Sequence, residues 1–303
     1  MRENFGYANM PMRIINMKNL KYYLKKAYTE HFAIGQFNFS TFEQVKGIVE
    51  AARAARAPLI LGTSEGESKF VGLEEAVALR NVLRNKTGLP IFLNLDHGKS
   101  AEYLKEAIVA GYDMVHFDGS KLPLDENIKI SREVVKFARW RNVVVEGEVG
   151  RFGTDASRLY TEKFEIKESD LTSADDAVRY MKATGVNVLA VSVGTFHGID
   201  ISGVSPHIRL DRLQEIKKVT SVPLVLHGGS GTPQEDIRQA IQTGICKINI
   251  NTQTRLAFTQ TLRNSLEGNK DEITPYKYLA GAIEAVREVT EKNIKLFGGE
   301  GKA

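Results

Sequence analysis

The chain has 303 residues, of which 42% are hydrophobic and 26% are charged, as is ordinary for a soluble globular protein. Its net charge of +4 is spread along the chain rather than clustered, which suits anionic small molecules better than nucleic acid. The single cysteine, Cys246, excludes a disulfide within the chain and fits a reducing compartment. Neither a signal core nor an apolar run of membrane-spanning length is present. We therefore expect a cytoplasmic protein with no membrane partner.

Apolar segments of strand length alternate along the chain with segments of helical periodicity. After a lead-in helix at 17–28, the predicted strands are 33–39, 58–62, 90–95, 114–118, 143–149, 188–193, 223–227 and 246–250. The helices that follow them are predicted at 41–56, 73–83, 101–110, 125–139, 174–183, 210–219, 233–242 and 254–266, and a closing helix at 276–296.

Eight strand–helix units in succession predict a (β/α)8 TIM barrel. No linker composition interrupts the series, so we expect one domain over 1–303, with a C-terminal helical extension at about 275–303. The competing architecture is a doubly wound open sheet, whose glycine fingerprint belongs in the first strand–helix turn. That turn, residues 38–41, contains no glycine, and the barrel is favoured.

The seventh predicted strand ends on His227 and runs through a glycine-rich loop into a helix. Thr232 is placed to cap that helix, Pro233 to occupy its first position, and Glu235 to complete a capping box. A glycine loop before a helix N-terminus presents backbone N–H groups to an anion. A tight turn with a half-exposed histidine is an alternative interpretation of the same sequence.

Three of the six histidines follow a predicted strand and precede a glycine: His97, His197 and His227. Because the strands of such a barrel end at one face, these imidazoles are expected to meet. Three neutral imidazoles around an open position form a catalytic zinc site, which Glu148 could join as an oxygen ligand. Asp96 is suited to act as a base beside the cation. His31, His116 and His207 are interpreted as structural.

The loops after the seventh and eighth strands are the usual phosphate site of this barrel. They contain Gly228, Ser230, Asn251 and Thr252, with Gly198 nearby, although these residue types also dominate ordinary turns. On the eighth strand, alternation places Lys247, Asn249 and Asn251 on one face, and Cys246, Ile248 and Ile250 on the other. A polar inward face there suggests a ligand.

Four ordered motifs resemble the class II, metal-dependent fructose-bisphosphate/tagatose-bisphosphate aldolases, and the resemblance runs from about Leu20 to the C-terminus. The motifs are NLDHG at 94–98, GTFHG at 194–198, LHGGSG at 226–231 and KININT at 247–252.

The resemblance implies zinc held by His97, His197 and His227, with Glu148 as a further ligand. It implies that Asp96 moves the proton of the hydroxyl on the fourth carbon while the bond between the third and fourth carbons breaks. The phosphate of dihydroxyacetone phosphate is then held by Gly198, Gly228, Ser230, Asn251 and Thr252. Asn249 contacts the hydroxyl or carbonyl end, and Asn38 and Ser64 line the pocket, Ser64 near a second phosphate. A monovalent cation (Na+ or K+) beside the glycine loops and a homodimer or homotetramer are also implied.

Among the departures of the chain from the family pattern, two bear most on the reaction. The loop after the fifth strand has no glutamate at the position used for proton transfer, so either Asp155 substitutes or a later acid such as Glu162 does. Residues 274–279 lack a family arginine that serves the second phosphate. The expected reaction is reversible cleavage of a phosphorylated ketose, fructose 1,6-bisphosphate first and tagatose bisphosphate or another phosphoketose as alternatives.

Three rival functions stay open at this point. A Schiff-base aldolase needs a desolvated lysine at a strand end, and Lys247 points the right way but lies below the rim. A non-catalytic phosphosugar-binding or assembly subunit could share the scaffold. A zinc hydrolase is disfavoured, since the early His-x-His of many such barrels is absent.

Overall fold

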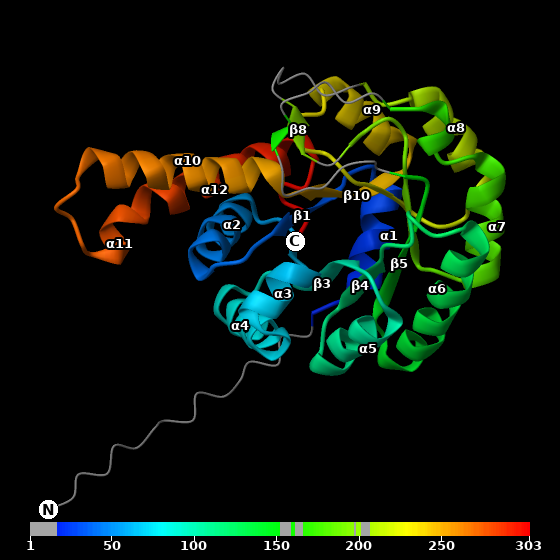
Figure 1. The fold of residues 1–303 in the computed structure, drawn as a ribbon, viewed down its shortest axis with the longest axis horizontal. Helices are drawn as coiled ribbons and strands as arrows, with labels where there is room; N and C mark the ends of the chain where they lie inside the picture. The colour runs from blue at the N-terminus through cyan, green and yellow to red at the C-terminus, as the bar shows by residue number, and fades with distance from the viewer. Residues whose placement is uncertain (1–16, 152–158, 161–165, 197, 201–206) are drawn as a thin grey trace, which may run out of the picture.

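The computed structural model describes residues 17–151, 159–160, 166–196, 198–200 and 207–303. Eight parallel strands close into a barrel in the order β1-β10-β9-β7-β5-β4-β3-β2 (Figure 1). The strands are β1 (Ile34–Asn38), β2 (Leu59–Ser64), β3 (Ile91–Gly98), β4 (Met114–Phe117), β5 (Val144–Val149), β7 (Val188–Val191), β9 (Leu224–Leu226) and β10 (Ile245–Ile250). The predicted (β/α)8 barrel is confirmed, and each predicted strand overlaps one of these.

The helices surround the barrel as predicted, with small shifts at their ends. They are α1 (Leu20–Glu30), α2 (Phe42–Ala55), α3 (Glu65–Val71), α4 (Leu73–Thr87), α5 (Ala101–Ala110), α6 (Leu124–Ala138), α7 (Ala174–Thr184), α8 (Leu210–Val219), α9 (Gln234–Thr243), α10 (Thr252–Gly268), α11 (Pro275–Tyr278) and α12 (Ala280–Leu296), with 3-10 turns η1 (Arg139–Arg141) and η2 (Glu168–Asp170). Among these described helices, none is long and apolar enough to cross a membrane.

Three local features differ from the sequence prediction. Helix α3 was not predicted, because its short polar sequence lacks apolar periodicity; a capping box between Ser64 and Glu67 starts it. The predicted closing helix is divided into α11 and α12. A short parallel pair, β6 (Leu159–Tyr160) with β8 (Ile199–Asp200), lies outside the barrel.

The predicted capping of α9 by Thr232 is wrong. The helix begins at Gln234, Pro233 precedes it in an extended conformation with ψ of 135°, and no side chain caps it. Thr232 Oγ1 instead donates to the carbonyl oxygen of Gly228 at 3.1 Å, so it closes the glycine loop upon itself.

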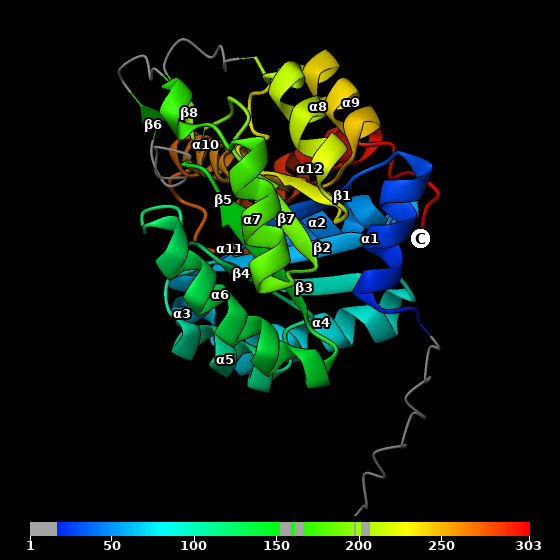
Figure 2. The ribbon, with the colours of Figure 1, turned by 90° about the vertical axis from the view of Figure 1, so that its right-hand side faces the viewer.

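The barrel interior has an apolar layer and a polar layer. Apolar side chains from the strands, among them Ile34, Phe92, Met114 and Val144, cluster with Leu24 of α1. Figure 2 shows α1 at one end of the barrel and the β6–β8 pair at the other. Because this end is sealed by α1 and apolar side chains, polar chemistry is confined to the end where the strands finish.

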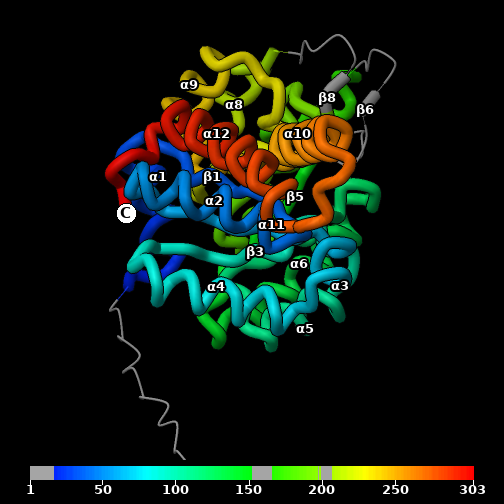
Figure 3. The backbone as a smooth tube through the Cα atoms, turned by 90° about the vertical axis from the view of Figure 1, so that its left-hand side faces the viewer, coloured from blue at the N-terminus to red at the C-terminus, as the bar shows by residue number. Residues whose placement is uncertain are grey.

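Helices α10 and α12 extend away from the barrel, with α11 near the tip of this arm (Figure 1). Helix α12 packs along both α2 and α10 (Figure 3). The arm therefore fixes the start of α10, which follows directly from β10 at the polar end of the barrel.

Candidate metal centre and active site

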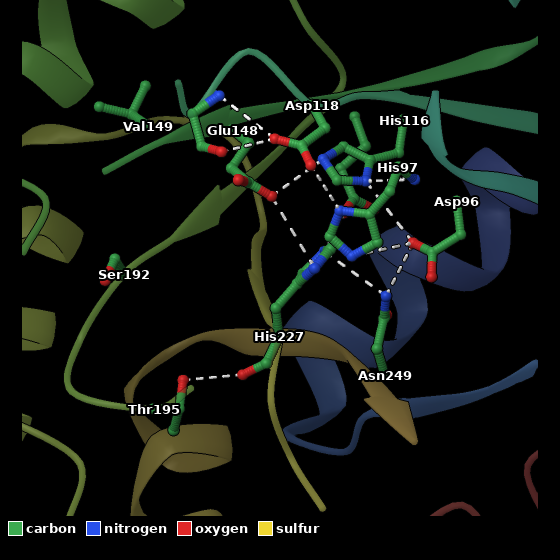
Figure 4. Close-up of polar contacts among 12 residues, drawn as sticks. Asp96, His97, His116, Asp118, Glu148, Val149, Ser192, Thr195, His227 and Asn249 are labelled. Atoms are coloured by element: carbon green, nitrogen blue, oxygen red, sulfur yellow. Dashed lines mark hydrogen bonds and ion pairs between the residues drawn. The ribbon is translucent and has the colours of Figure 1, made fainter. Parts of the chain in front are cut away.

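The interior faces of the barrel strands carry a buried layer of polar side chains. Several strands contribute to it, and the side chains converge on one space (Figure 4). Its members are Gln36, Asn38, Asn94, Asp96, His116, Glu146, Glu148, His227, Lys247 and Asn249, all 7% exposed or less. Buried polar atoms need hydrogen-bond or ionic partners, and a core has no use for so many of them. The layer therefore indicates a functional site.

Three imidazoles of the described residues meet in this space, although they come from β3, from β4 and from the position directly after β9. The ring centroids of His97 and His227 lie 4.9 Å apart, and His116 lies 4.8 Å from each of them. One ligand atom from each ring and one from Asp96 lie within 4.8 Å of one another. Zinc bonded to several imidazoles at about 2.0–2.1 Å places their ring centroids about 5 Å apart. The cluster therefore has the dimensions of a metal site.

Carboxylates orient two of these rings from behind. His97 Nδ1 lies 3.1 Å from Asp118 Oδ2, and Asp118 is itself held by the Ser120 hydroxyl at 2.6 Å. His227 Nε2 lies 2.6 Å from Glu146 Oε1. These carboxylate–histidine pairs fix each ring, so the opposite nitrogens, Nε2 of His97 and Nδ1 of His227, would be the ones to bind a metal.

The charges of the site call for a cation. Four carboxylates, those of Asp96, Asp118, Glu146 and Glu148, gather among the described residues of the site, and the ammonium of Lys247 and the imidazoles face them. Burial raises the pKa of Asp96, yet the imidazoles of His97 and His116 outweigh it and hold that pKa well below its usual range. A divalent cation would compensate these carboxylates when the ligand imidazoles are neutral, so the donor set fits a metal ion.

The pKa values of His97 and His227 are shifted in opposite directions. Burial lowers the pKa of His97, but Asp96 and Asp118 outweigh it and raise the pKa to about 9. Burial lowers the pKa of His227 to about 4, against the opposing effect of its hydrogen bond to the Glu146 carboxylate. His227 is thus neutral and ready to bind a metal at neutral pH, whereas His97 must first lose a proton.

Metal affinity is therefore expected to rise with pH. Below pH 9, the metal-free protein carries a proton on His97 that the metal must displace, so the apparent affinity gains about tenfold per pH unit between pH 6 and 8. Competition titrations with a chelator at pH 6, 7 and 8, corrected for the protonation of the chelator, measure this. An affinity that does not change over this interval would contradict the assignment of His97 as a ligand.

Asp96 is held beside the imidazoles in a fixed orientation. Its Oδ2 accepts from Asn38 Nδ2 at 3.0 Å and its Oδ1 accepts from Asn249 Nδ2 at 3.1 Å. The carboxylate is 3% exposed and ionised, as the lowered pKa requires. An ionised carboxylate at the edge of a metal site can accept a proton from a bound hydroxyl.

The predicted anion loops come together from three neighbouring strands, β7, β9 and β10. Gly228 has φ of 67°, and a Cβ there would lie 2.3 Å from the carbonyl oxygen of Phe196, so only glycine lets these loops touch. Ser230 Oγ accepts from the backbone N–H of Gln253 at 3.4 Å, which joins the β9 loop to α10. Asn251 and Thr252 lie at the N-terminus of α10, where anions are stabilised.

A second polar chain leads from Asp96 to an arginine that sequence analysis did not single out. Asn38 Nδ2 also donates to Glu67 Oε2 at 3.2 Å, and Glu67 Oε1 pairs with Arg255 Nη2 at 2.5 Å. The backbone N–H of Ser64 donates to the same Glu67 carboxylate at 2.7 Å. Arg255 is 30% exposed, so this chain places a cation near Ser64.

The structure brings together most of the predicted site residues. His227, Glu148, Asp96, Asn38 and Asn249 belong to the buried layer, and His97 lies at its edge with its side chain 18% exposed. Gly198, Gly228, Ser230, Asn251 and Thr252 lie on the adjoining loops. Ser64 lies at the end of β2 beside Glu67. His197, Asp155 and Glu162 lie outside the described residues.

His116 is the main residue of the cluster that the sequence prediction treated as structural. Strand alternation offered the missing signal, since His116 is two residues before Asp118 and shares its face of β4. The same reasoning applies to Glu146, two residues before Glu148. A histidine in mid-strand of a parallel barrel points either into the barrel or into the helix layer, and the sequence alone does not say which.

The structure also corrects the faces predicted for β10. Cys246 packs in the interior cluster, whereas Ile248 and Ile250 pack against the helices. An irregularity in the β9–β10 pairing between Ile245 and Lys247 breaks the alternation there. Lys247 Nζ lies 2.8 Å from Glu146 Oε2 and 2.6 Å from Asn249 Oδ1, and this ion pair disfavours it as a Schiff-base nucleophile.

A cavity of about 380 Å3 lies at the other end of the barrel, between α1 and the beginnings of β7 and β9. Its lining is mostly apolar, with Lys21 and Lys25 on α1 and Asn187 and Ser221 on the loops. It contains none of the carboxylates and imidazoles described above, so it is a poor place for the chemistry.

Comparison with known proteins agrees with the geometry. The family model described as fructose-bisphosphate aldolase class-II matches residues 18–302. The 6-phospho-5-dehydro-2-deoxy-D-gluconate aldolase of Bacillus licheniformis is 38% identical over 295 residues, which cover 96% of this chain and 97% of that one. The protein with the same name in Bacillus subtilis is 37% identical, with 96% and 98% covered.

Two solved structures have the same fold. The YdjI aldolase of Escherichia coli K12 has a TM-score of 0.77 and 29% identity, covering 94% of this chain and 99% of that one. A fructose-bisphosphate aldolase of Campylobacter jejuni has a TM-score of 0.77 at 21% identity, covering 94% and 95%, and shows the fold alone. With a matching family model and close relatives along almost its entire length, the chain is an aldolase, hence a lyase, and belongs to the class II fructose-bisphosphate aldolase family.

Proposed function

We propose that this chain is a zinc-dependent aldolase that reversibly cleaves a phosphorylated ketose and releases dihydroxyacetone phosphate. The observation that carries the proposal is the cluster of imidazoles with ionised Asp96 at its edge. His97 and His227 would hold the zinc together with His197, whose neighbour Phe196 touches Gly228 beside His227. Glu148, with Oε2 at 3.9 Å from His227 Nδ1, is placed to serve as a further ligand.

A bound zinc ion would polarise the ketone of the substrate and stabilise negative charge as the carbon–carbon bond breaks. Asp96 accepts the proton of the hydroxyl on the carbon that becomes the aldehyde, and returns it in the condensation direction. Asn249 donates one hydrogen bond to Asp96, so a substrate oxygen bound there is positioned next to the base. On the ketone side, Asp155 is proposed to transfer the second proton.

The phosphate of the ketone half would bind at Gly198, Gly228, Ser230, Asn251 and Thr252. These residues lie next to His227 along β7, β9 and β10, so the ketone is directed toward the imidazoles. Binding at a phosphate group remote from the reacting bond supplies orientation. A monovalent cation, Na+ or K+, beside these loops is proposed with it.

The identity of the substrate depends on the aldehyde half. In 6-phospho-5-dehydro-2-deoxy-D-gluconate, on which the relatives are named to act, cleavage between the third and fourth carbons gives dihydroxyacetone phosphate and 3-oxopropanoate. Fructose or tagatose 1,6-bisphosphate gives the same ketone and glyceraldehyde 3-phosphate. We propose the deoxygluconate as the first substrate, because its relatives match almost the whole chain at 36–38% identity.

Both aldehydes end in an anion, and Arg255 is the cation placed to meet it. Substitution Arg255→Met is expected to lower kcat/KM for condensation with 3-oxopropanoate or glyceraldehyde 3-phosphate about 10- to 100-fold, as for a lost hydrogen bond to a charged group. Condensation with neutral glyceraldehyde is expected to change less than about threefold. Arg263→Met, on the same helix, serves as the matched control. Equal losses with charged and neutral aldehydes would contradict this role.

A comparison of substrates tests the proposal. The zinc-loaded protein is incubated in parallel with the deoxygluconate, fructose 1,6-bisphosphate and tagatose 1,6-bisphosphate, and dihydroxyacetone phosphate is measured. We expect cleavage that a chelator abolishes and added zinc restores, fastest with the deoxygluconate. Zinc bound without cleavage of any of the three would favour a non-catalytic phosphosugar-binding subunit, and full activity without metal would contradict the proposal.

We also propose that the protein forms a homodimer or homotetramer through the projecting arm. Ile273 is 86% exposed and Tyr276 is 73% exposed, both near the tip formed with α11, and Leu266 of α10 is 43% exposed. Apolar side chains gathered at the end of a projecting arm favour burial against another chain.

A further inference from the structure

His116 has no role in the mechanism above, yet it lies at the centre of the cluster. Its side chain is completely buried and its ring is as near to His97 and His227 as those rings are to each other. Proximity alone would make it one more metal ligand. The hydrogen bonds of its two nitrogens decide between a ligand and a supporting residue.

The first nitrogen is occupied by the backbone of His97. The N–H of His97 donates to His116 Nδ1 at 3.1 Å. A backbone N–H can only donate, so in this contact Nδ1 presents its lone pair and the ring proton is on Nε2. Asp96 Oδ1 is a longer neighbour of the same Nδ1, at 3.5 Å. A nitrogen that bears a proton cannot bind a metal, and the lone pair of Nδ1 is already used.

An irregular backbone explains why His97 needs this bond. The β3–β4 pairing shifts register between Leu95 and Gly98, and His97 has φ of 52°, in the left-handed region. The N–H of His97 is therefore diverted from the ladder to a side chain. His116 satisfies it and stabilises the turn that aims the His97 ring into the barrel.

The second nitrogen faces Glu148. His116 Nε2 lies 3.1 Å from Glu148 Oε2, and both side chains are at most 1% exposed. Among the described residues neither atom forms a well-aligned hydrogen bond, with the other or with any third group, so each still needs a partner. A buried N–H and a buried carboxylate oxygen at this separation are each other's natural partners.

We propose that His116 is a positioning residue that links His97 to Glu148. Its Nδ1 fixes the backbone of His97, and its Nε2–H holds the carboxylate of Glu148 at the metal site. The inference rests on the proposed function, because it treats His97 and Glu148 as residues of a zinc site. His116 supports two residues of that site and is not itself a ligand.

A double-mutant cycle on zinc affinity tests this link. His116→Met removes both hydrogen bonds at similar volume, and His116→Gln keeps an acceptor and a donor. Each is made in the wild-type and Glu148→Ala backgrounds, and zinc affinity is measured by chelator competition. We expect His116→Met to weaken zinc binding about 10- to 100-fold, as is typical for residues that orient ligands. His116→Gln should recover at least about threefold of that loss.

In the Glu148→Ala background, His116→Met should have an effect at least about threefold smaller, since coupled residues are not additive. Equal effects in both backgrounds would overturn the link to Glu148. An anomalous difference map of zinc-loaded crystals adds a direct reading, because zinc within about 2.1 Å of a His116 nitrogen would make it a ligand and overturn the inference.

Thermal unfolding of each variant controls for folding. If His116→Met does not fold, the cycle is completed with His116→Leu, which also removes both hydrogen bonds, and Glu148→Ala, where additivity contradicts the inference in the same way. Wild-type protein that binds no zinc would contradict the proposed function and the inference together. Normal zinc binding and cleavage with no coupling would contradict the inference alone.

Discussion

Replacing His227 with alanine is expected to remove zinc and turnover together. The ring is fully buried, and the substitution deletes one ligand and leaves Glu146 Oε1 without its partner at 2.6 Å, while Oε2 keeps its ion pair with Lys247. Zinc affinity should fall by more than the roughly 10- to 100-fold typical of outer-shell substitutions. Loss of the metal's stabilisation of charge, several kcal/mol, should lower kcat/KM by about a thousandfold or more.

Metal content after dialysis and cleavage of the best substrate measure these two effects. His207→Ala is the matched control, because that ring is 80% exposed and pairs with Asp236 away from the cluster. Its zinc content and turnover should equal those of the wild type. A His227→Ala protein that keeps its zinc at wild-type affinity would refute the ligand assignment, and its thermal unfolding shows whether any loss is due to misfolding instead.

Asp96→Asn is expected to separate metal binding from catalysis. Asparagine keeps the shape of the side chain, and His97 and His227 remain oriented by Asp118 and Glu146. Zinc should therefore stay bound while turnover falls about 10²- to 10⁴-fold, the usual contribution of a general base.

The half-reaction on the ketone side provides a sharper reading. Proton exchange of dihydroxyacetone phosphate with solvent does not use the aldehyde-side base, so Asp96→Asn should retain it within about tenfold. Asp155→Asn, in contrast, should lose this exchange. Normal cleavage by the Asp96→Asn protein would show that Asp96 has another role. Loss of proton exchange as complete as the loss of cleavage would show the same.

The fold was predictable because the signals for it are local. Each apolar run of strand length is followed by a helical run, and eight such units leave few architectures. Exceptions arose where short polar segments depend on single contacts, as in α3, which starts at the Ser64–Glu67 box. The extended conformation of Pro233 before α9 and the pairing irregularity before Lys247 likewise depend on local backbone geometry, which a residue pattern does not reveal.

The site was predictable where a residue sits at a strand end, as His97, His227 and Asp96 do. It was not predictable for His116, because a mid-strand histidine becomes functional only through the direction in which its strand faces. Arg255 and Glu67 pair across 188 positions of sequence, and no spacing rule connects them. Long-range polar pairs of this kind follow from the closed barrel rather than from any one segment.

The central claim is that imidazoles from separate strands bind one zinc ion beside Asp96, and an anomalous difference map at the zinc absorption edge tests it most directly. Zinc-loaded crystals should show a peak about 2.0–2.1 Å from His97 Nε2 and from His227 Nδ1. A fully loaded crystal whose zinc peaks all lie away from these two nitrogens would contradict the account.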